Sequence, residues 1–261
     1  MSFAHLHVHT EYSLLDGSNK ITEYVSRVKE LGMTAAAITD HGVMSGVPEL
    51  CDACAAVEKE TGKKVKPIYG CEVYFTTDET LARDGKPKLY HLLLLAKTNE
   101  GYHNLVRLVS ESHVDNFYYK PRTTLGMLRE YHEGIICQSA CVQGIIPQNI
   151  LDGNFDEAER WARIYQDIFG DDFYIEIQDH GLDFRGGFND RTLDEQLGQV
   201  FSLSVDAFLR SFLIIEHGLC NLKLVCDDLP GSSIVSVGVE LLGAGNCALK
   251  GSRLDRSVLG D

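Results

Sequence analysis

The chain has 261 residues, with 24 Lys or Arg against 38 Asp or Glu, so its formal net charge is -14. This balance argues against binding nucleic acid through a positive surface, but not against nucleic acid held by a metal site or another domain. The hydrophobic content of 44% is enough for a buried core and too high for a disordered chain. No apolar run of about 18 residues and no signal peptide occur, which predicts a cytoplasmic protein with no membrane partner.

Strands and helices are predicted to alternate up to about residue 180, from the spacing of apolar residues. The predicted strands are 3–9, 35–39, 67–75, 90–96, 134–138 and 173–178. The predicted helices are 18–31, 48–60, 99–112 and 155–169. Such alternation is typical of a parallel α/β sheet or barrel, in which functional groups gather at the C-terminal ends of the strands.

The first predicted strand carries three histidines at alternate positions. Because side chains of a strand alternate between its faces, His5, His7 and His9 share one face. Three neighbouring imidazoles would repel one another if protonated, whereas neutral imidazoles readily bind a cation. The alternative is a polar strand with unrelated histidines.

Four further predicted strand ends carry side chains that can bind metals, namely Asp40 with His41, then Glu72, His91 and Cys141. Each has an ordinary reading alone, as a helix cap, a paired carboxylate, a structural histidine or a small buried thiol. Together they form a mixed set of nitrogen, oxygen and sulfur ligands, which suits Zn, Mn or Fe. Several ligands in one cavity would allow two or three metals, as in phosphoester hydrolysis.

These motifs resemble the polymerase and histidinol phosphatase (PHP) superfamily, and most closely the N-terminal PHP domains of bacterial DNA polymerase III alpha subunits. The resemblance runs in register from about residue 3 to 182. The segments that carry it include HVHTEYSLLDG at 7–17, TDHG at 39–42, GCEVY at 70–74, HLLLLAK at 91–97, YYKPR at 118–122, SAC at 139–141 and YIEIQDHG at 174–181.

The resemblance implies a distorted (β/α)7 barrel with a cleft for up to three divalent metals, Zn or Mn. The ligands that it implies are His7, His9, Asp16, His41, Glu72, His91 and Cys141. His5 is not carried over as a ligand. Family domains with an intact ligand set can show metal-dependent 3′-5′ exonuclease activity, and those with a degraded set support the polymerase structurally. The implied partners are DNA through a parent polymerase, other polymerase domains and a proofreading exonuclease subunit.

The chain departs from the family near residue 182. The family's last metal motif, Asp-x-His, is not found, since the only later histidine, His217, follows Ile215 and Glu216. All 11 Tyr and the single Trp also precede this point. A second domain would explain both changes, but we favour a coding frameshift near Gly181 or a degenerate end. We therefore expect a PHP metal-binding domain at 1–182, incomplete at its C-terminal end, and an unassigned tail at 183–261.

Three functions stay open at this point. The domain could be a metal-dependent phosphoesterase acting on a DNA 3′ end, a non-catalytic module that supports a polymerase, or a free-standing phosphatase.

Two further motifs have plain explanations. Cys51 and Cys54 form a C-x-x-C inside a predicted helix, which favours packing over redox chemistry. The segment 120–122, Lys-Pro-Arg, is either a nucleic-acid or domain contact or a loop stiffened by proline.

Overall fold

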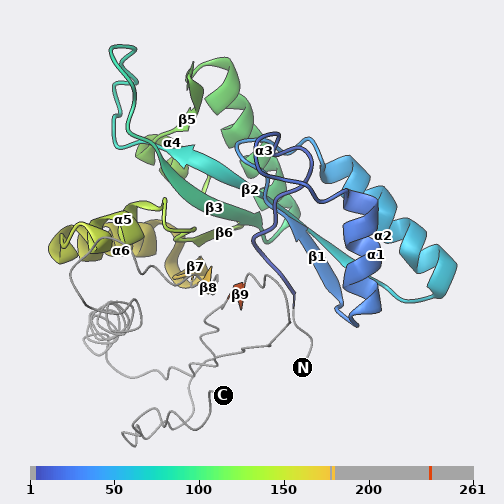
Figure 1. Ribbon diagram of the computed structural model, residues 1–261. Coiled ribbons are helices and arrows are strands. Elements are labelled where there is room, and N and C mark those ends of the chain that lie inside the picture. Colours follow the sequence, from blue (N-terminus) through green and yellow to red (C-terminus); the bar gives the residue numbers. More distant parts are fainter. Residues whose placement is uncertain (1–3, 177, 180–234, 237–261) are drawn as a thin grey trace, which may run out of the picture.

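The computed structural model describes residues 4–176, 178–179 and 235–236 (Figure 1). Almost all of the predicted tail at 183–261 lies outside the described residues, as does His217. The boundary at residue 182 and the frameshift therefore stay predictions. Within the described part of the chain, no helix is both long enough and apolar enough to cross a membrane.

Helices and strands follow one another along the described residues. The helices are α1 (Ile21–Glu30), α2 (Val47–Thr61), α3 (Asn99–Val114), α4 (Leu125–Tyr131), α5 (Ile145–Leu151) and α6 (Phe155–Phe169). The strands are β1 (Ala35–Ile38), β2 (Lys66–Phe75), β3 (Tyr90–Ala96), β4 (Phe117–Tyr118), β5 (Lys120–Thr123), β6 (Ile135–Gln138), β7 (Phe173–Tyr174), β8 (Gln178–Asp179) and β9 (Val235–Ser236). The short strands β8 and β9 pair with each other, antiparallel.

The helices α1, α2, α3 and α6 and the strands β1, β2, β3 and β6 lie where the sequence predicts them. The segment 3–9 is different, because its described residues run beside β1 without forming a strand. Val8 does accept a backbone hydrogen bond from Thr39 at 2.8 Å, but its own N–H donates to the Thr39 hydroxyl, also at 2.8 Å. A side-chain acceptor thus takes the place of the next backbone carbonyl, and the ladder stops.

The main sheet is mixed rather than parallel. Within the described residues it has seven strands in the order β4-β5-β2-β3-β6-β7, with β1 beside β2. Strand β3 runs antiparallel to both β2 and β6, whereas β1 and β5 run parallel to β2. The reason is the connection from β2 to β3, a long loop without a helix that extends away from the sheet (Figure 1), because a parallel neighbour needs a crossover. This open α/β sheet is consistent with an incomplete barrel of the PHP type.

Two hydrophobic clusters hold the helices on the sheet. In α1, the buried residues Ile21, Val25 and Val28 recur at helical spacing and pack with α2 against β1. A larger cluster joins β2, β3 and β6 to α3, α4 and α6, with Trp161 and Tyr165 of α6 among its members. In Figure 1, α1 and α2 lie on the β1 side of the sheet, and α5 and α6 lie on the opposite side.

Candidate metal centre

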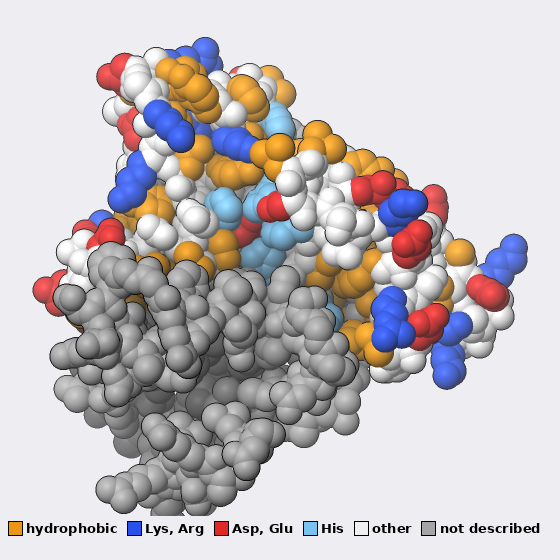
Figure 2. All heavy atoms as spheres, in the orientation of Figure 1, with side chains coloured by type: hydrophobic (Ala, Val, Ile, Leu, Met, Phe, Trp, Pro, Cys, Tyr) orange, Lys and Arg blue, Asp and Glu red, His pale blue; other side chains and the backbone are white. Residues whose placement is uncertain are grey.

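Glu72 of β2 is the centre of a histidine cluster. Its carboxylate is only 1% exposed, and Oε1 lies 3.2 Å from Nε2 of His7 and 3.2 Å from Nδ1 of His91. The other oxygen, Oε2, lies 2.6 Å from Nδ1 of His41 and 3.6 Å from Nε2 of His9. Figure 2 shows pale-blue histidine side chains gathered in a hollow on the face drawn. One buried carboxylate therefore faces four imidazoles from three segments of the chain.

Two triads within this cluster have the spacing of metal ligands. In the triad of His7, His9 and Glu72, and again in that of His41, Glu72 and His91, the ligand atoms lie within 4.8 Å of one another. Glu72 belongs to both triads, and each of its carboxylate oxygens lies near one histidine of each triad. Neutral imidazole and carboxylate are common ligands of first-row divalent metals.

Two buried atoms of the cluster lack the hydrogen bonds that buried polar atoms normally make. His41 Nδ1 and Glu72 Oε2 lie 2.6 Å apart, yet among the residues described neither has a hydrogen-bond partner in suitable geometry. An unsatisfied buried polar group costs about 1–3 kcal/mol. Lone pairs of both atoms converging on one cation would remove this cost, so the residues present fit a divalent metal.

The remaining implied ligands lie at the edges of the cluster. Cys141 Sγ lies 3.5 Å from His91 Nδ1 and 3.7 Å from Glu72 Oε1. Asp16, on a more exposed loop, places Oδ2 2.8 Å from His41 Nε2. All seven residues implied by the resemblance thus come together, six of them around Glu72 or as Glu72 itself, and Asp16 through His41. His5 belongs to neither triad.

Backbone hydrogen bonds bring these segments to one edge of the sheet. The Gly42 N–H donates to the Glu72 carbonyl at 2.8 Å, which fixes the turn after β1 beside β2. The His91 N–H donates to the carbonyl of Gln143 at 3.0 Å, which ties the loop of Cys141 to the start of β3. Because β3 is antiparallel, its first residues lie beside the last residues of β2, with His91 opposite Tyr74. His91 therefore reaches the site from the beginning of a strand.

Comparison with known proteins identifies the family of the chain. The PHP domain family matches residues 5–180 of the chain. The chain belongs to the PHP family.

Relatives of this PHP domain are alpha subunits of DNA polymerase III. The subunit of Helicobacter pylori strain J99 is 42% identical over 219 residues, covering 80% of this chain and 17% of its own. The subunit of Treponema pallidum is 43% identical, covering 70% of this chain and 16% of its own. The subunit of Deinococcus radiodurans is 43% identical, covering 69% of this chain and 14% of its own. The chain spans less than a fifth of the length of these relatives.

One solved structure similar to the PHP domain comes from Bifidobacterium adolescentis, and metal-dependent phosphoesterase activity has been suggested for that protein. The two chains are 13% identical with a TM-score of 0.36, and the match covers 77% of this chain and 96% of the other.

Glu176 is a buried carboxylate of this PHP domain that our sequence reasoning did not assign to the site. Its Oε1 accepts a hydrogen bond from Nδ1 of His7 at 2.6 Å. The Glu176 N–H donates to the Ser139 hydroxyl at 2.9 Å, so its backbone is tied to the Cys141 loop. A carboxylate on the far nitrogen of a metal-binding histidine typically fixes the ring and its tautomer. The signal was available, since Glu176, like Glu72, is a lone acid between apolar residues.

His9 is oriented in a similar way by Ser13 and Asp40. The Ser13 hydroxyl donates to Asp40 Oδ1 at 2.7 Å and lies 3.3 Å from His9 Nδ1. Because its only proton goes to Asp40, this hydroxyl accepts from His9, whose Nε2 then faces Glu72. Asp40 is 1% exposed and also accepts from the backbone N–H and the hydroxyl of Thr10. Asp40 therefore supports the ligand loop, and is not part of either triad.

The charges in the PHP site follow from burial and these contacts. Burial by itself would raise the pKa of Glu72, but close contacts with His41, His7 and His91 outweigh it and hold that pKa well below its usual range. Burial would lower the pKa of His7, yet bonds to Glu176 and Glu72 raise it to about 10. Burial lowers the pKa of His9 to about 4, so this ring is neutral.

Residues at the rim of the cluster also have shifted pKa values. The His41 pKa is raised, because its contacts with Glu72 and Asp16 outweigh the effect of burial. Burial raises the pKa of the Cys141 thiol to about 12, with the negative charge of Glu72 acting in the same direction. The ionised Glu72 thus lies against a protonated His7, and its charge favours the protonated form of His41. A divalent cation could take over the role of these protons.

Proposed function

We propose that this chain is the PHP domain of a bacterial replicative DNA polymerase and that its histidine cluster holds Zn or Mn for hydrolysis of DNA phosphoesters at a 3′ end. The observation that carries the proposal is the buried Glu72 carboxylate facing His7, His9, His41 and His91 within 3.6 Å. The similarity to DNA polymerase III alpha subunits supports the proposal that the parent protein is such a polymerase.

The donor set decides which metals we propose. His7, His9 and Glu72 would hold one ion, and His41, Glu72 and His91 a second, with Asp16 and Cys141 as further ligands. Imidazole and thiolate with carboxylate favour Zn or Mn over Mg or Ca, which prefer oxygen alone. When bound, such ions supply an activated water and neutralise the charge of the phosphate.

The chain's own residues give this site its order. Glu176 holds His7 through Nδ1, and Ser13 holds His9 through Nδ1, so both rings present Nε2 to the same carboxylate. Burial of Glu72 keeps bulk water from its oxygens. The ligand atoms are therefore arranged before any metal or substrate arrives, which lowers the ordering cost of binding.

A non-catalytic structural role is the second candidate, and one observation favours it. No Asp-x-His motif follows residue 182 in the sequence, so the ligand set implied by the family is short by two. We further propose that the tail at 183–261 is a frameshift product or a degenerate end. Reading the other frames of the source DNA downstream of codon 182 should then restore an Asp-x-His motif, and its absence from every frame would refute the frameshift.

The proposed setting follows from the parent protein. Its partners would be DNA, the other domains of the polymerase and a proofreading exonuclease subunit, all in the cytoplasm. Polymerisation itself would belong to the remainder of the parent chain. The present chain, which covers 17% of the Helicobacter pylori relative, would contribute the metal site.

Elemental analysis and a digestion assay test the proposal on the full 261-residue chain. We expect bound Zn or Mn, and shortening of a DNA strand from its 3′ end that requires the metal. His9→Ala should lose metal and digestion together, whereas exposed His103→Ala should lose neither. Bound metal without digestion would favour the structural role. Absence of metal from the wild-type chain would refute the metal centre, and hydrolysis of phosphate monoesters alone would indicate a free-standing phosphatase.

A further inference from the structure

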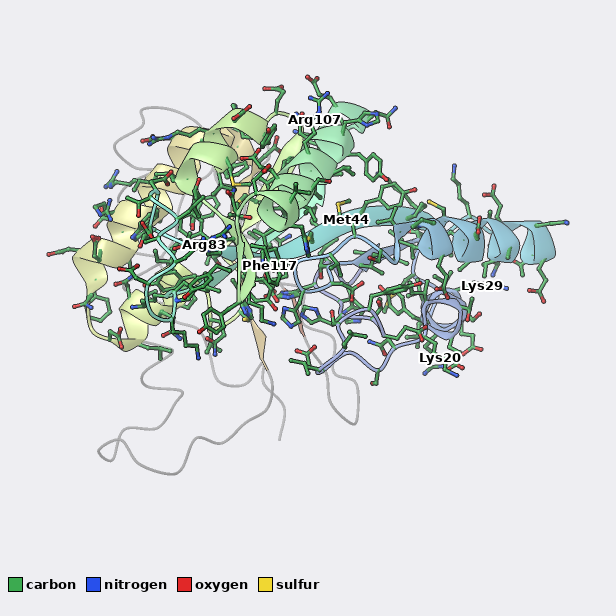
Figure 3. The ribbon with its side chains drawn as sticks, turned by 90° about the horizontal axis from the view of Figure 1, so that it is seen from above. Lys20, Lys29, Met44, Arg83, Arg107 and Phe117 are labelled. Carbon is green, nitrogen blue, oxygen red and sulfur yellow. The ribbon has the colours of Figure 1, made fainter. Side chains whose placement is uncertain are left out.

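Lys120 projects from a tight hairpin at the rim of the histidine cluster. Strands β4 and β5 pair across Tyr119, whose φ of 60° closes the turn. Figure 3 labels Phe117 at the start of this hairpin. The Lys120 ammonium lies 4.9 Å from the centre of the Tyr74 ring and donates to the Tyr74 hydroxyl at 3.2 Å. Lysine and tyrosine therefore form one unit.

Tyr74 joins this unit to the proposed metal ligands. Its ring centre lies 5.5 Å from that of His91 and 6.0 Å from that of His41. Gly42, the residue after His41, lies against the same unit: a Cβ at this position would come within 2.9 Å of Pro121 and 3.1 Å of Tyr74. The hairpin is thus packed closely against the ligand loop, and Lys120 is one side chain away from His41 and His91.

The charge of Lys120 is not neutralised by the described part of the protein. No ion pair joins it to a carboxylate there, whereas Lys97 pairs with Asp172 at 2.8 Å. Arg122, two residues further on, is 1% exposed and donates to three backbone carbonyls, so it is not available to a ligand. Figure 2 shows Lys and Arg side chains bordering the hollow that holds the histidines. A cation that no carboxylate neutralises, at the edge of the histidine cluster, suits an anionic ligand.

We propose that Lys120, held over the ring of Tyr74, contacts a phosphate oxygen of the substrate at the edge of the metal centre. The inference rests on the function proposed above and adds a substrate-binding residue to it. Tyr74 accepts a hydrogen bond from Lys120, which leaves its own hydroxyl proton to donate to the same phosphate. The shared chemistry is a phosphate group, either of a DNA end or of a small monoester.

The experiment compares Lys120→Met with a matched control in the full chain. Lys88→Met removes the same charge from a lysine that also lies over a tyrosine, with Nζ 5.1 Å from the centre of the Tyr90 ring. Tyr90 belongs to the hydrophobic core and not to the histidine cluster. The readouts are bound metal, the affinity for a short fluorescent single strand with a phosphorothioate at its 3′-terminal linkage, and KM and kcat with DNA and with p-nitrophenyl phosphate.

We expect Lys120→Met to keep its metal but to bind the strand about tenfold more weakly, with a smaller salt dependence, because one phosphate contact is lost. KM should rise more than kcat falls. Lys120→Arg should keep an affinity for the strand within about threefold of that of the wild type, because it keeps the charge. Lys88→Met should bind the strand as tightly as the wild type does. If only the DNA strand binds more weakly, Lys120 contacts the phosphate of DNA. If the monoester also binds more weakly, Lys120 contacts any phosphate group.

The outcomes separate this inference from the function beneath it. If the wild-type chain binds metal and DNA and Lys120→Met behaves like Lys88→Met, the role of Lys120 is refuted and the metal centre stands. If Lys120→Met loses its metal, Lys120 supports the site structurally and the inference is also refuted. A wild-type chain without metal or DNA binding would overturn both proposals.

Discussion

Nδ1 of His7 donates to Glu176 across 2.6 Å, although 169 positions separate the two residues in the sequence. This bond joins the first ligand segment of the domain to the segment after β7. It also decides which nitrogen of His7 faces Glu72, since only Nε2 remains, at 3.2 Å from Oε1. Glu176, late in the PHP domain, thus sets the orientation of the His7 ring near its start.

Glu176→Gln should therefore weaken metal binding without removing any of the implied ligands. Loss of the carboxylate lowers the basicity of His7 and frees its ring, and such outer contacts are typically worth about 10- to 100-fold in metal affinity. Competition with a fluorescent chelator measures the change. Glu58→Gln, on the exposed side of α2, is the control and should bind as the wild type does. Equal affinities for both variants would show that Glu176 does not position His7.

The metal-free chain should lose stability as the pH rises. The His7 pKa is about 10 in the folded chain against 6.5 for an unperturbed histidine. Between these values the folded state binds the proton and the unfolded state does not, so the stabilisation is complete below about pH 6.5 and disappears on passing pH 10. Urea unfolding with a chelator present should show a decrease on the order of 1 kcal/mol or more. His7→Gln should flatten this dependence, and an unchanged slope would contradict the assignment.

Gly42→Ala should be clearly more destabilising than Gly62→Ala. Both glycines have a positive φ, of 66° and 67°, so alanine pays a similar backbone cost of about 1 kcal/mol at each. At Gly42 the new Cβ also meets Pro121 and Tyr74, whereas nothing lies within 4 Å at Gly62. Urea unfolding of the two variants isolates the packing term. Equal losses would mean that the hairpin is not pressed against the ligand loop.

Arg122→Met should destabilise the domain by about 3 kcal/mol, because three backbone carbonyls lose their donor. Arg122 donates to Leu81, Ala82 and Asn116 at 2.9 to 3.0 Å and so anchors the long loop between β2 and β3. Arg83 lies on the same loop, is exposed and is labelled in Figure 3. Arg83→Met should change the stability by no more than about 0.5 kcal/mol. Thermal unfolding and limited proteolysis of the loop compare the two, and similar effects would exclude the anchoring role.

The sequence predicted the elements with a clear apolar period, such as α6, and it singled out members of the histidine cluster that belong to a family motif, such as His7 and Glu72. The direction of β3 could not be predicted from alternation, because it depends on a connection that contains no helix. The segment 3–9 was wrongly expected to form a strand, since over its described residues a threonine hydroxyl takes the place of a backbone acceptor. Glu176 reaches the site through a tertiary contact with His7, and only its place as a lone acid between apolar residues pointed to it. Lys120 reaches the site through Tyr74, and such a contact leaves no periodic signal.

The shared position of Glu72 has a thermodynamic consequence for the proposed metals. A single carboxylate serves both triads, so an ion in one of them changes the charge and orientation that the other offers. Linkage requires this influence to be equal in both directions. Titration of the two ions should then give binding steps that are not independent, and a substitution in either triad should alter the affinity of its neighbour.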